Sequence, residues 1–131
     1  MNFENLFLPS INNNKFKEMN PIVLAFIGDG VHTLYVRDRV VKESSLLVND
    51  CHIKSAKYCK AKTQAEKLDL ITSILTEDEQ NIVRRARNAK THNIAKNSDI
   101  ETYKKATSYE ALIGYLYLIG NYDRLKEILK Y

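Results

Sequence analysis

The sequence contains little proline, glycine or cysteine, and it has no tryptophan and no long hydrophobic run. Its 131 residues include two prolines, four glycines and two cysteines. Cys51 and Cys59 form no CxxC pair, and they are typical of reduced thiols in a cytosolic protein. No apolar run is long enough to span a membrane, and the first residues do not resemble a signal peptide. We therefore expect a cytoplasmic protein without a membrane segment.

The abundant residues are helix formers, chiefly Leu, Ala, Lys, Glu and Ile, which predicts an all-α fold in one domain spanning 1–131. Capping signals mark the helix boundaries at Asn20–Pro21, Thr76–Glu79, Ser98–Glu101 and Gly120–Asn121. We expect about six helices, at 21–42, 50–59, 62–75, 77–88, 99–119 and 121–130, after an N-terminal extension over 1–19.

Positive charge is unevenly distributed along the chain, whose net charge is +4. Residues 51–67 contain five lysines and one acidic residue, and residues 84–105 contain seven basic residues and two acidic ones. The polar loop Asn88–Asp99 lies within the second stretch. This segregation favours a surface for a polyanion, although ordinary solvated helix faces would also carry such lysines.

Two carboxylates lie inside the most apolar segments. Asp29 stands between two glycines in "LAFIGDGVHTLYV", and Glu110 is the one acid in "YEALIGYLYLIG". Helices this apolar point to burial, and a buried carboxylate without a partner costs several kcal/mol. Each acid could pair with Lys or Arg, both could face solvent against the character of their neighbours, or both could bind one Mg²⁺.

The combination of paired carboxylates and basic stretches is suited to phosphodiester hydrolysis. A divalent cation can activate water and neutralise charge on the phosphate, while Lys and Arg hold the nucleic-acid backbone. The same basic residues would also suit a plain RNA-binding module, so charge does not separate an enzyme from a binding protein.

Several motifs resemble those of ribonuclease III domains. "LAFIGDGVHTLYVRDRVV" is similar to the signature helix usually written "LEFLGDAVL", and "YEALIGYLYL" is similar to "DxFEALIGAIYLD". Further segments resemble the Mini-ribonuclease III branch, namely "HIKSAKYCKAKTQAE", "RRARNAK" and "KNSDIETYKKATSYEALIGYL". The resemblance extends from about residue 20 to the end of the chain.

This resemblance implies an all-α ribonuclease III catalytic domain that forms a homodimer and lacks a separate double-stranded-RNA-binding domain. It implies Mg²⁺-dependent cleavage of double-stranded RNA, with Mn²⁺ as a substitute, to give 5′-phosphate and 3′-hydroxyl ends. The biological substrate it implies is precursor 23S ribosomal RNA. The motif carboxylates correspond to Asp29 and Glu110, whereas two further acids of the larger relatives correspond to Ala25 and Thr107.

The expected RNA contacts are polar residues in the basic stretches. A-form RNA is recognised mainly by shape, through phosphates and 2′-hydroxyls. The candidates are Lys62, Gln64, Arg84, Arg85, Arg87, Asn88 and Lys90. We also expect helix 109–119, which is apolar on every face, to lie at a two-fold interface. The alternative function is a non-catalytic double-stranded-RNA-binding protein on a degenerate domain, because positions 25 and 107 lack carboxylates.

Overall fold

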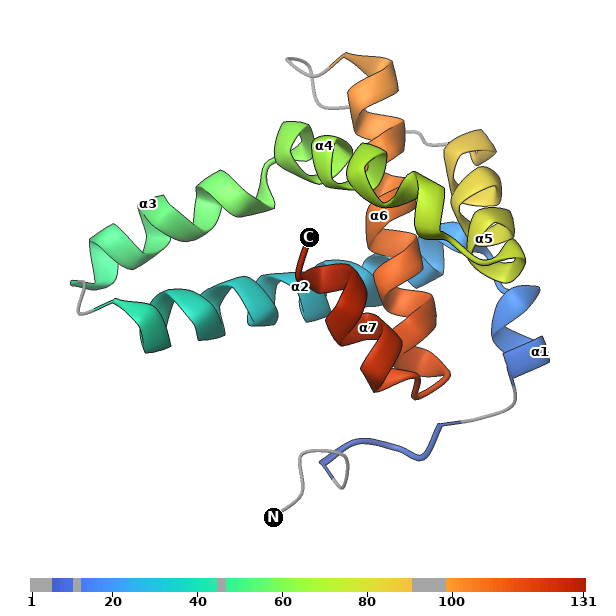
Figure 1. Cartoon of the computed structure of the whole chain (residues 1–131), viewed down its shortest axis with the longest axis horizontal. Coiled ribbons are helices and arrows are strands. Elements are labelled where there is room, and N and C mark those ends of the chain that lie inside the picture. The colour runs from blue at the N-terminus through green and yellow to red at the C-terminus, as the bar shows by residue number, and fades with distance from the viewer. Residues whose placement is uncertain (1–5, 11–12, 45–46, 91–98) are drawn as a thin grey trace.

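Helix α6 (Ile100–Leu118) forms the centre of the molecule, and most of the other helices pack around it (Figure 1). The computed structural model describes residues 6–10, 13–44, 47–90 and 99–131. In order along the chain the other elements are α1 (Asn13–Lys17), α2 (Pro21–Glu43), α3 (Val48–Cys59), α4 (Ala61–Ile71), the short 3₁₀ turn η2 (Thr72–Ile74), α5 (Glu77–Asn88) and α7 (Tyr122–Leu129). These described residues contain no β-strand, which confirms the predicted all-α class.

The six predicted helices are all present, with boundaries that differ by a few residues. The predicted helix 62–75 is divided into α4 and η2, and α1 was not predicted. No helix in the described part of the chain is long and apolar enough to cross a membrane.

Capping interactions account for several of the helix boundaries. Asn20 accepts a hydrogen bond from the Ile22 amide at the start of α2, and Thr76 and Glu79 form the predicted capping box of α5. At the end of α6, Gly120 adopts a positive φ of 76°, and the Asn121 amide donates to the Leu116 carbonyl at 3.0 Å. This is a Schellman motif, which only a residue tolerant of the left-handed conformation forms easily.

The start of α6 differs from the prediction. Asp99, rather than Ser98, is the N-cap residue of the helix, and its side chain accepts hydrogen bonds from the amides of Glu101 and Thr102. Ser98 lies outside the described residues.

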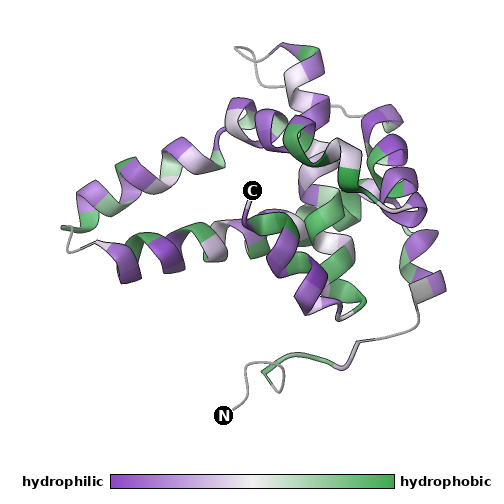
Figure 2. Cartoon of the chain, viewed as in Figure 1, coloured by the Kyte–Doolittle hydropathy of each residue, from purple (hydrophilic) through white to green (hydrophobic). Residues whose placement is uncertain are grey.

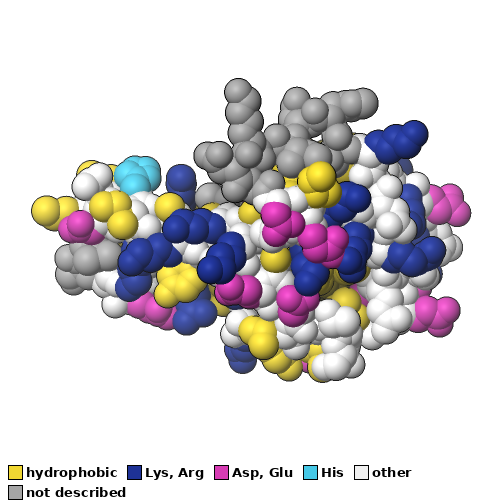
Figure 3. All heavy atoms as spheres, turned by 90° about the horizontal axis from the view of Figure 1, so that it is seen from above, with side chains coloured by type: hydrophobic (Ala, Val, Ile, Leu, Met, Phe, Trp, Pro, Cys, Tyr) yellow, Lys and Arg dark blue, Asp and Glu magenta, His cyan; other side chains and the backbone are white. Residues whose placement is uncertain are grey.

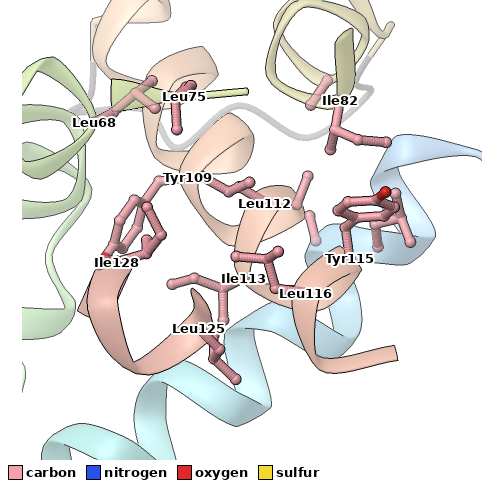
Figure 4. Close-up of a cluster of buried hydrophobic side chains, with 14 of the residues drawn as sticks. Leu68, Leu75, Ile82, Tyr109, Leu112, Ile113, Tyr115, Leu116, Leu125 and Ile128 are labelled. Carbon is pink, nitrogen blue, oxygen red and sulfur yellow. The ribbon is translucent and has the colours of Figure 1, made fainter. Parts of the chain in front are cut away.

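The hydrophobic core is built around the second half of α6. Figure 4 shows Tyr109, Leu112, Ile113 and Leu116 of this helix among side chains from α4, α5 and α7. Residues 111–116 are all buried by the chain itself. The argument that helix 109–119 needs a second subunit to cover it is therefore wrong, because α2, α4, α5 and α7 already surround it.

The second half of α2 and helix α3 extend from this core as a two-helix arm, on the left in Figure 1. Figure 2 shows that hydrophobic residues concentrate where the helices meet around α6, whereas α3 is largely hydrophilic. The arm leads back to the core through α4, which packs on α6.

Candidate active site

Helices α2 and α6 cross in direct backbone contact at two glycines. A Cβ atom on Gly28 would lie 1.7 Å from the Glu110 carbonyl oxygen, and one on Gly114 would lie 1.9 Å from the Leu24 carbonyl oxygen. No side chain fits at either position, so glycine permits the crossing. Of the two glycines beside Asp29, Gly28 lies at the close helix approach, whereas Gly30 has no atom within 4 Å of an added Cβ.

This crossing brings Asp29 and Glu110 together. Burial, a hydrogen bond with Asp29 and the negative charge of Asp29 raise the pKa of Glu110 to about 8. Glu110 is half-buried, whereas Asp29 is exposed, so the expectation that both acids would enter the interior is wrong for Asp29. The pair thus forms a carboxylate site at the surface, with one member set into the helix crossing.

Neither carboxylate forms an ion pair with a Lys or Arg among the described residues. Two acids held together without a cation favour protonation of one of them, or binding of a metal ion. The described residues contain no group of three or more His, Cys, Asp or Glu side chains that could hold a metal. A cation bound by this pair would need further ligands from water or from a substrate phosphate.

The residues that align with the missing acids lie close to this pair in the chain and are buried. Ala25 lies one turn before Asp29 on α2, and Thr107 lies one turn before Glu110 on α6. Neither side chain offers a carboxylate, which agrees with a site built on two acids.

Cys59 at the end of α3 lies near the site and was not predicted to do so. Burial raises the pKa of its thiol, and the charges of Asp29 and Glu110 raise it further. A hydrogen bond with Thr33 acts in the opposite direction but does not outweigh them. No local sequence signal predicts that Cys59 lies near α2, because this proximity depends on the tertiary arrangement of α2, α3 and α4.

His32 and Gln64 form a buried polar contact behind the carboxylates. The Gln64 amide nitrogen lies 3.2 Å from His32 Nδ1, and the His32 ring packs edge-on against Tyr109. Burial and the positive charge of Lys67 lower the pKa of His32 to about 4, so the imidazole is neutral at pH 7. Gln64 is only 3% exposed, which corrects its assignment as an RNA contact. Its amide instead joins α4 to α2.

Five of the predicted RNA contacts are exposed, and four of these form no ion pair with another described residue. These four are Lys62 at the start of α4 and Arg84, Asn88 and Lys90 at the end of α5 and just beyond it. Arg84 donates to the Asn81 side chain at 3.0 Å and remains on the surface. These side chains are available to a polyanion.

The other two arginines of this stretch are engaged within the protein. Arg85 donates to the carbonyl oxygens of Lys17, Glu18 and Met19, and thereby fixes the connection between α1 and α2. Arg87 forms an ion pair with Glu101 of α6. We therefore assign Arg85 a structural role, while Arg87 is exposed and could exchange its carboxylate for a phosphate. Most of the loop Asn88–Asp99, including His92, lies outside the described residues.

Comparison with known proteins places these features in a family. The sequence profile of the Ribonuclease III domain matches residues 22–121. The chain is 47% identical to the Mini-ribonuclease 3 of Thermoanaerobacter sp. over 86% of its own length and 79% of that protein. It is 42% identical to the Mini-ribonuclease 3 of Staphylococcus aureus, with 88% of each chain covered.

A solved structure agrees with these sequence matches. The crystal structure of a protein from Fusobacterium nucleatum superimposes with a TM-score of 0.79 at 27% identity, covering 86% of this chain and 90% of that one. The fold and the paired-carboxylate helices thus define an endoribonuclease of the ribonuclease III class. Within that class, the chain belongs to the Mini-ribonuclease 3 family.

Proposed function

We propose that this protein is a Mg²⁺-dependent endoribonuclease that cleaves double-stranded RNA at a site formed by Asp29 and Glu110. We propose precursor 23S ribosomal RNA as its substrate and the cytoplasm as its place of action. The observation that carries the proposal is the meeting of two carboxylates at the Gly28–Gly114 helix crossing, neither of which forms an ion pair with a described Lys or Arg.

The residues present fit a divalent cation. Oxygen ligands from one or two carboxylates are the usual protein contribution to a Mg²⁺ site, and water and phosphate complete the coordination. The raised pKa of Glu110 indicates that negative charge at this place is poorly compensated by the protein alone. When bound, Mg²⁺ would polarise the scissile phosphate, activate water and stabilise charge on the leaving oxygen, and Mn²⁺ could replace it.

The chain's own residues have distinct tasks in this scheme. Asp29 and Glu110 would hold the cation, and the helix crossing sets how closely their main chains approach, because Gly28 and Gly114 place no side chain between the helices. The exposed side chains Lys62, Arg84 and Lys90 would bind phosphates, and Asn88 would contact 2′-hydroxyls. On the face seen in Figure 3, Lys and Arg side chains lie on the arm and also on the core of the molecule, with acidic side chains among them.

A homodimer is part of the proposal, and α2 offers a surface for it. Apolar side chains follow one stripe of this helix and are exposed, namely Val23, Phe26, Leu34 and Val41. Phe26 is 81% exposed, which is unusual for an aromatic residue without a partner. Asp29 lies at the border of this stripe, so pairing two copies across it would place two carboxylate sites beside one shared surface.

Separate measurements of cleavage and binding test the proposed function. We would substitute Asp29→Asn and Glu110→Gln, with Glu66→Gln as the matched control, because Glu66 is an exposed acid on α4. The substrate is a perfect RNA duplex, with Mg²⁺ or with chelator. The proposal predicts that both site variants lose cleavage and retain RNA binding, whereas the control cleaves normally.

The alternative, a non-catalytic RNA-binding protein, rests on the absence of carboxylates at Ala25 and Thr107. It predicts no Mg²⁺-dependent cleavage by the unaltered protein, together with salt-dependent duplex binding. Cleavage that persists in both site variants would instead show that the reaction takes place elsewhere on the protein.

A further inference from the structure

A pocket lies on the arm, away from the carboxylate pair. It has a volume of about 280 Å³ and is bounded by α2, α3, α4 and the residues that follow α7. Four basic residues line it, Arg39, Lys54, Lys67 and Lys130, together with the aromatic rings of Tyr58 and Tyr131. Its volume is near the lower end of the roughly 300–1,000 Å³ of small-molecule sites. The pocket therefore suits a compact ligand.

The charges in this pocket are unbalanced. Among the described residues Glu43 is the one acidic side chain that lines it, and its carboxylate is already bound by Arg39 at 3.0 Å. Lys67 is half-buried, and its ammonium group donates only to the Leu129 carbonyl oxygen, at 3.4 Å, among the contacts of the described residues. Burial and the positive charge of Arg39 lower the pKa of Lys67. An anion in the pocket would offset both effects, because its opposite charge stabilises the protonated ammonium group.

The aromatic rings at the pocket are accessible. Tyr58 and Tyr131 are 46% and 49% exposed, so part of each ring is open to a ligand. A third ring, that of Tyr35, has the Arg39 guanidinium 5.7 Å from its centroid. Exposed rings beside cations are the combination that binds a nucleobase by stacking and its phosphate by charge.

We propose that this pocket binds a single nucleotide unit, with its base against Tyr58 and Tyr131 and its phosphate at Lys67 and Lys130. The site is separate from the carboxylate pair, because Arg39 follows Asp29 by ten residues, or about 15 Å along the helix. It goes beyond the proposed cleavage function and would bind without a metal. The nucleotide unit could be a free mononucleotide or the 5′-phosphorylated end of an RNA strand.

Calorimetric titration with adenosine 5′-monophosphate in the presence of chelator tests the proposal. We expect one saturable site per chain, with weaker binding of adenosine and of ribose 5-phosphate because each lacks half of the ligand. The proposal fails if the monophosphate binds no more tightly than these two fragments, or if no saturation occurs up to about 1 mM.

Two variants test whether the nucleotide binds in this pocket. Lys67→Met keeps the aliphatic stem and removes the charge, and Tyr58→Leu removes a stacking ring. Loss of one charge-assisted hydrogen bond should weaken binding about tenfold or more. Lys126→Met is the matched control, because Lys126 is exposed on α7 outside the pocket. Equal weakening in the control, or unchanged binding in both pocket variants with normal thermal unfolding, would overturn the assignment.

A comparison of short RNA strands identifies the source of the nucleotide. If the pocket takes a strand end, a tetranucleotide with a 5′-phosphate should bind more tightly than the same strand with a 5′-hydroxyl. It should also bind more tightly than the free monophosphate. If the pocket takes a free nucleotide, the monophosphate should bind most tightly. The Asp29→Asn and Glu110→Gln variants should bind nucleotide normally, which separates this proposal from that of the cleavage site.

Discussion

Gly28 on α2 lies directly against the main chain of Glu110 on α6. An added Cβ atom at Gly28 would be 1.7 Å from the Glu110 carbonyl oxygen, so the neighbouring backbone would have to move. The residue after Gly28 is Asp29, and the contact therefore sets how closely the two carboxylates approach. The stability of the fold and the geometry of the candidate site depend on the same helix crossing.

Gly28→Ala should destabilise the protein strongly. Overpacking of a core usually costs about 1–3 kcal/mol, and contact with backbone rather than a flexible side chain places this change at or above that range. Gly30→Ala is the matched control two residues away, because open space surrounds it and alanine favours helix by about 0.5–1 kcal/mol. Urea unfolding measures the free energy of unfolding of both variants. Equal stability of the two variants would contradict the close crossing.

The pH dependence of stability should report on Glu110. Its folded pKa of about 8 exceeds the ordinary value of 4.5, so the folded state holds this proton more tightly than the unfolded chain does. The contribution is therefore full below pH 4.5 and is lost as the pH rises towards 8, by up to a few kcal/mol. Unfolding in chelator should show this decline, and Glu110→Gln should remove it.

Added Mg²⁺ supplies the control for that measurement. A cation that binds the ionised pair stabilises the folded state at high pH, so the decline between pH 4.5 and 8 should become shallower. A profile that Mg²⁺ leaves unchanged in the unaltered protein would argue against metal binding at Asp29 and Glu110.

Much of this fold could be predicted because its signals are local. Asn20, the Thr76–Glu79 box and Gly120 each satisfy backbone groups within a few residues, so sequence spacing reveals them. Glu110 also stood out, as an acid within an apolar helix. Asp29 was identified for the same reason, although its side chain proves to be exposed.

The roles of Gln64 and Arg85 could not be predicted in this way. Gln64 follows Lys62 in a basic stretch and looks like a surface residue, but its partner His32 is 32 residues away on another helix. Arg85 resembles its neighbour Arg84, yet its donors reach carbonyl oxygens at Lys17 and Met19. Only the tertiary arrangement distinguishes residues of the same type within one basic run.

The ion pair between Arg124 and Glu79 should be important for stability. Glu79 is 3% exposed, and the Arg124 guanidinium donates to both of its carboxylate oxygens. Arg124→Met leaves this buried acid uncompensated, which should cost about 3–5 kcal/mol. Lys42→Met breaks the exposed pair with Asp38 and should cost no more than about 1 kcal/mol. Denaturant unfolding of the two variants makes the comparison.

Acid titration provides a second reading of the same pair. Burial alone would raise the pKa of Glu79, but hydrogen bonds from Arg124 and Thr76 outweigh it and hold the pKa below its ordinary value. The stabilisation is therefore present above pH 4.5 and is lost as the pH falls through the lowered pKa. In Arg124→Met this loss should shrink or reverse, because only the hydrogen bonds from Thr76 then oppose burial and the pKa of Glu79 rises. An unchanged acid profile would show that Arg124 does not set the pKa of Glu79.

The neighbouring arginines of α5 should behave differently when substituted. Arg84→Met should weaken duplex RNA binding and lower the log–log salt slope by about one, because it removes one phosphate contact. Arg85→Met should mainly reduce stability, since its donors bind carbonyl oxygens at Lys17, Glu18 and Met19. Filter binding at several salt concentrations measures the RNA affinity of both variants, and thermal unfolding measures their stability. The assignment is reversed if Arg85→Met changes the salt slope and Arg84→Met does not.

Phe26→Lys should convert the proposed homodimer to monomers. Phe26 is the most exposed apolar side chain of the α2 stripe, and a charge in the centre of an apolar interface is left unpaired and desolvated. Leu70→Lys is the matched control, because Leu70 is an exposed apolar residue on α4. Sedimentation should show monomers for the first variant and dimers for the control, and duplex cleavage should fall only in the first. A dimer that survives Phe26→Lys would place the subunit interface on a surface other than this stripe of α2.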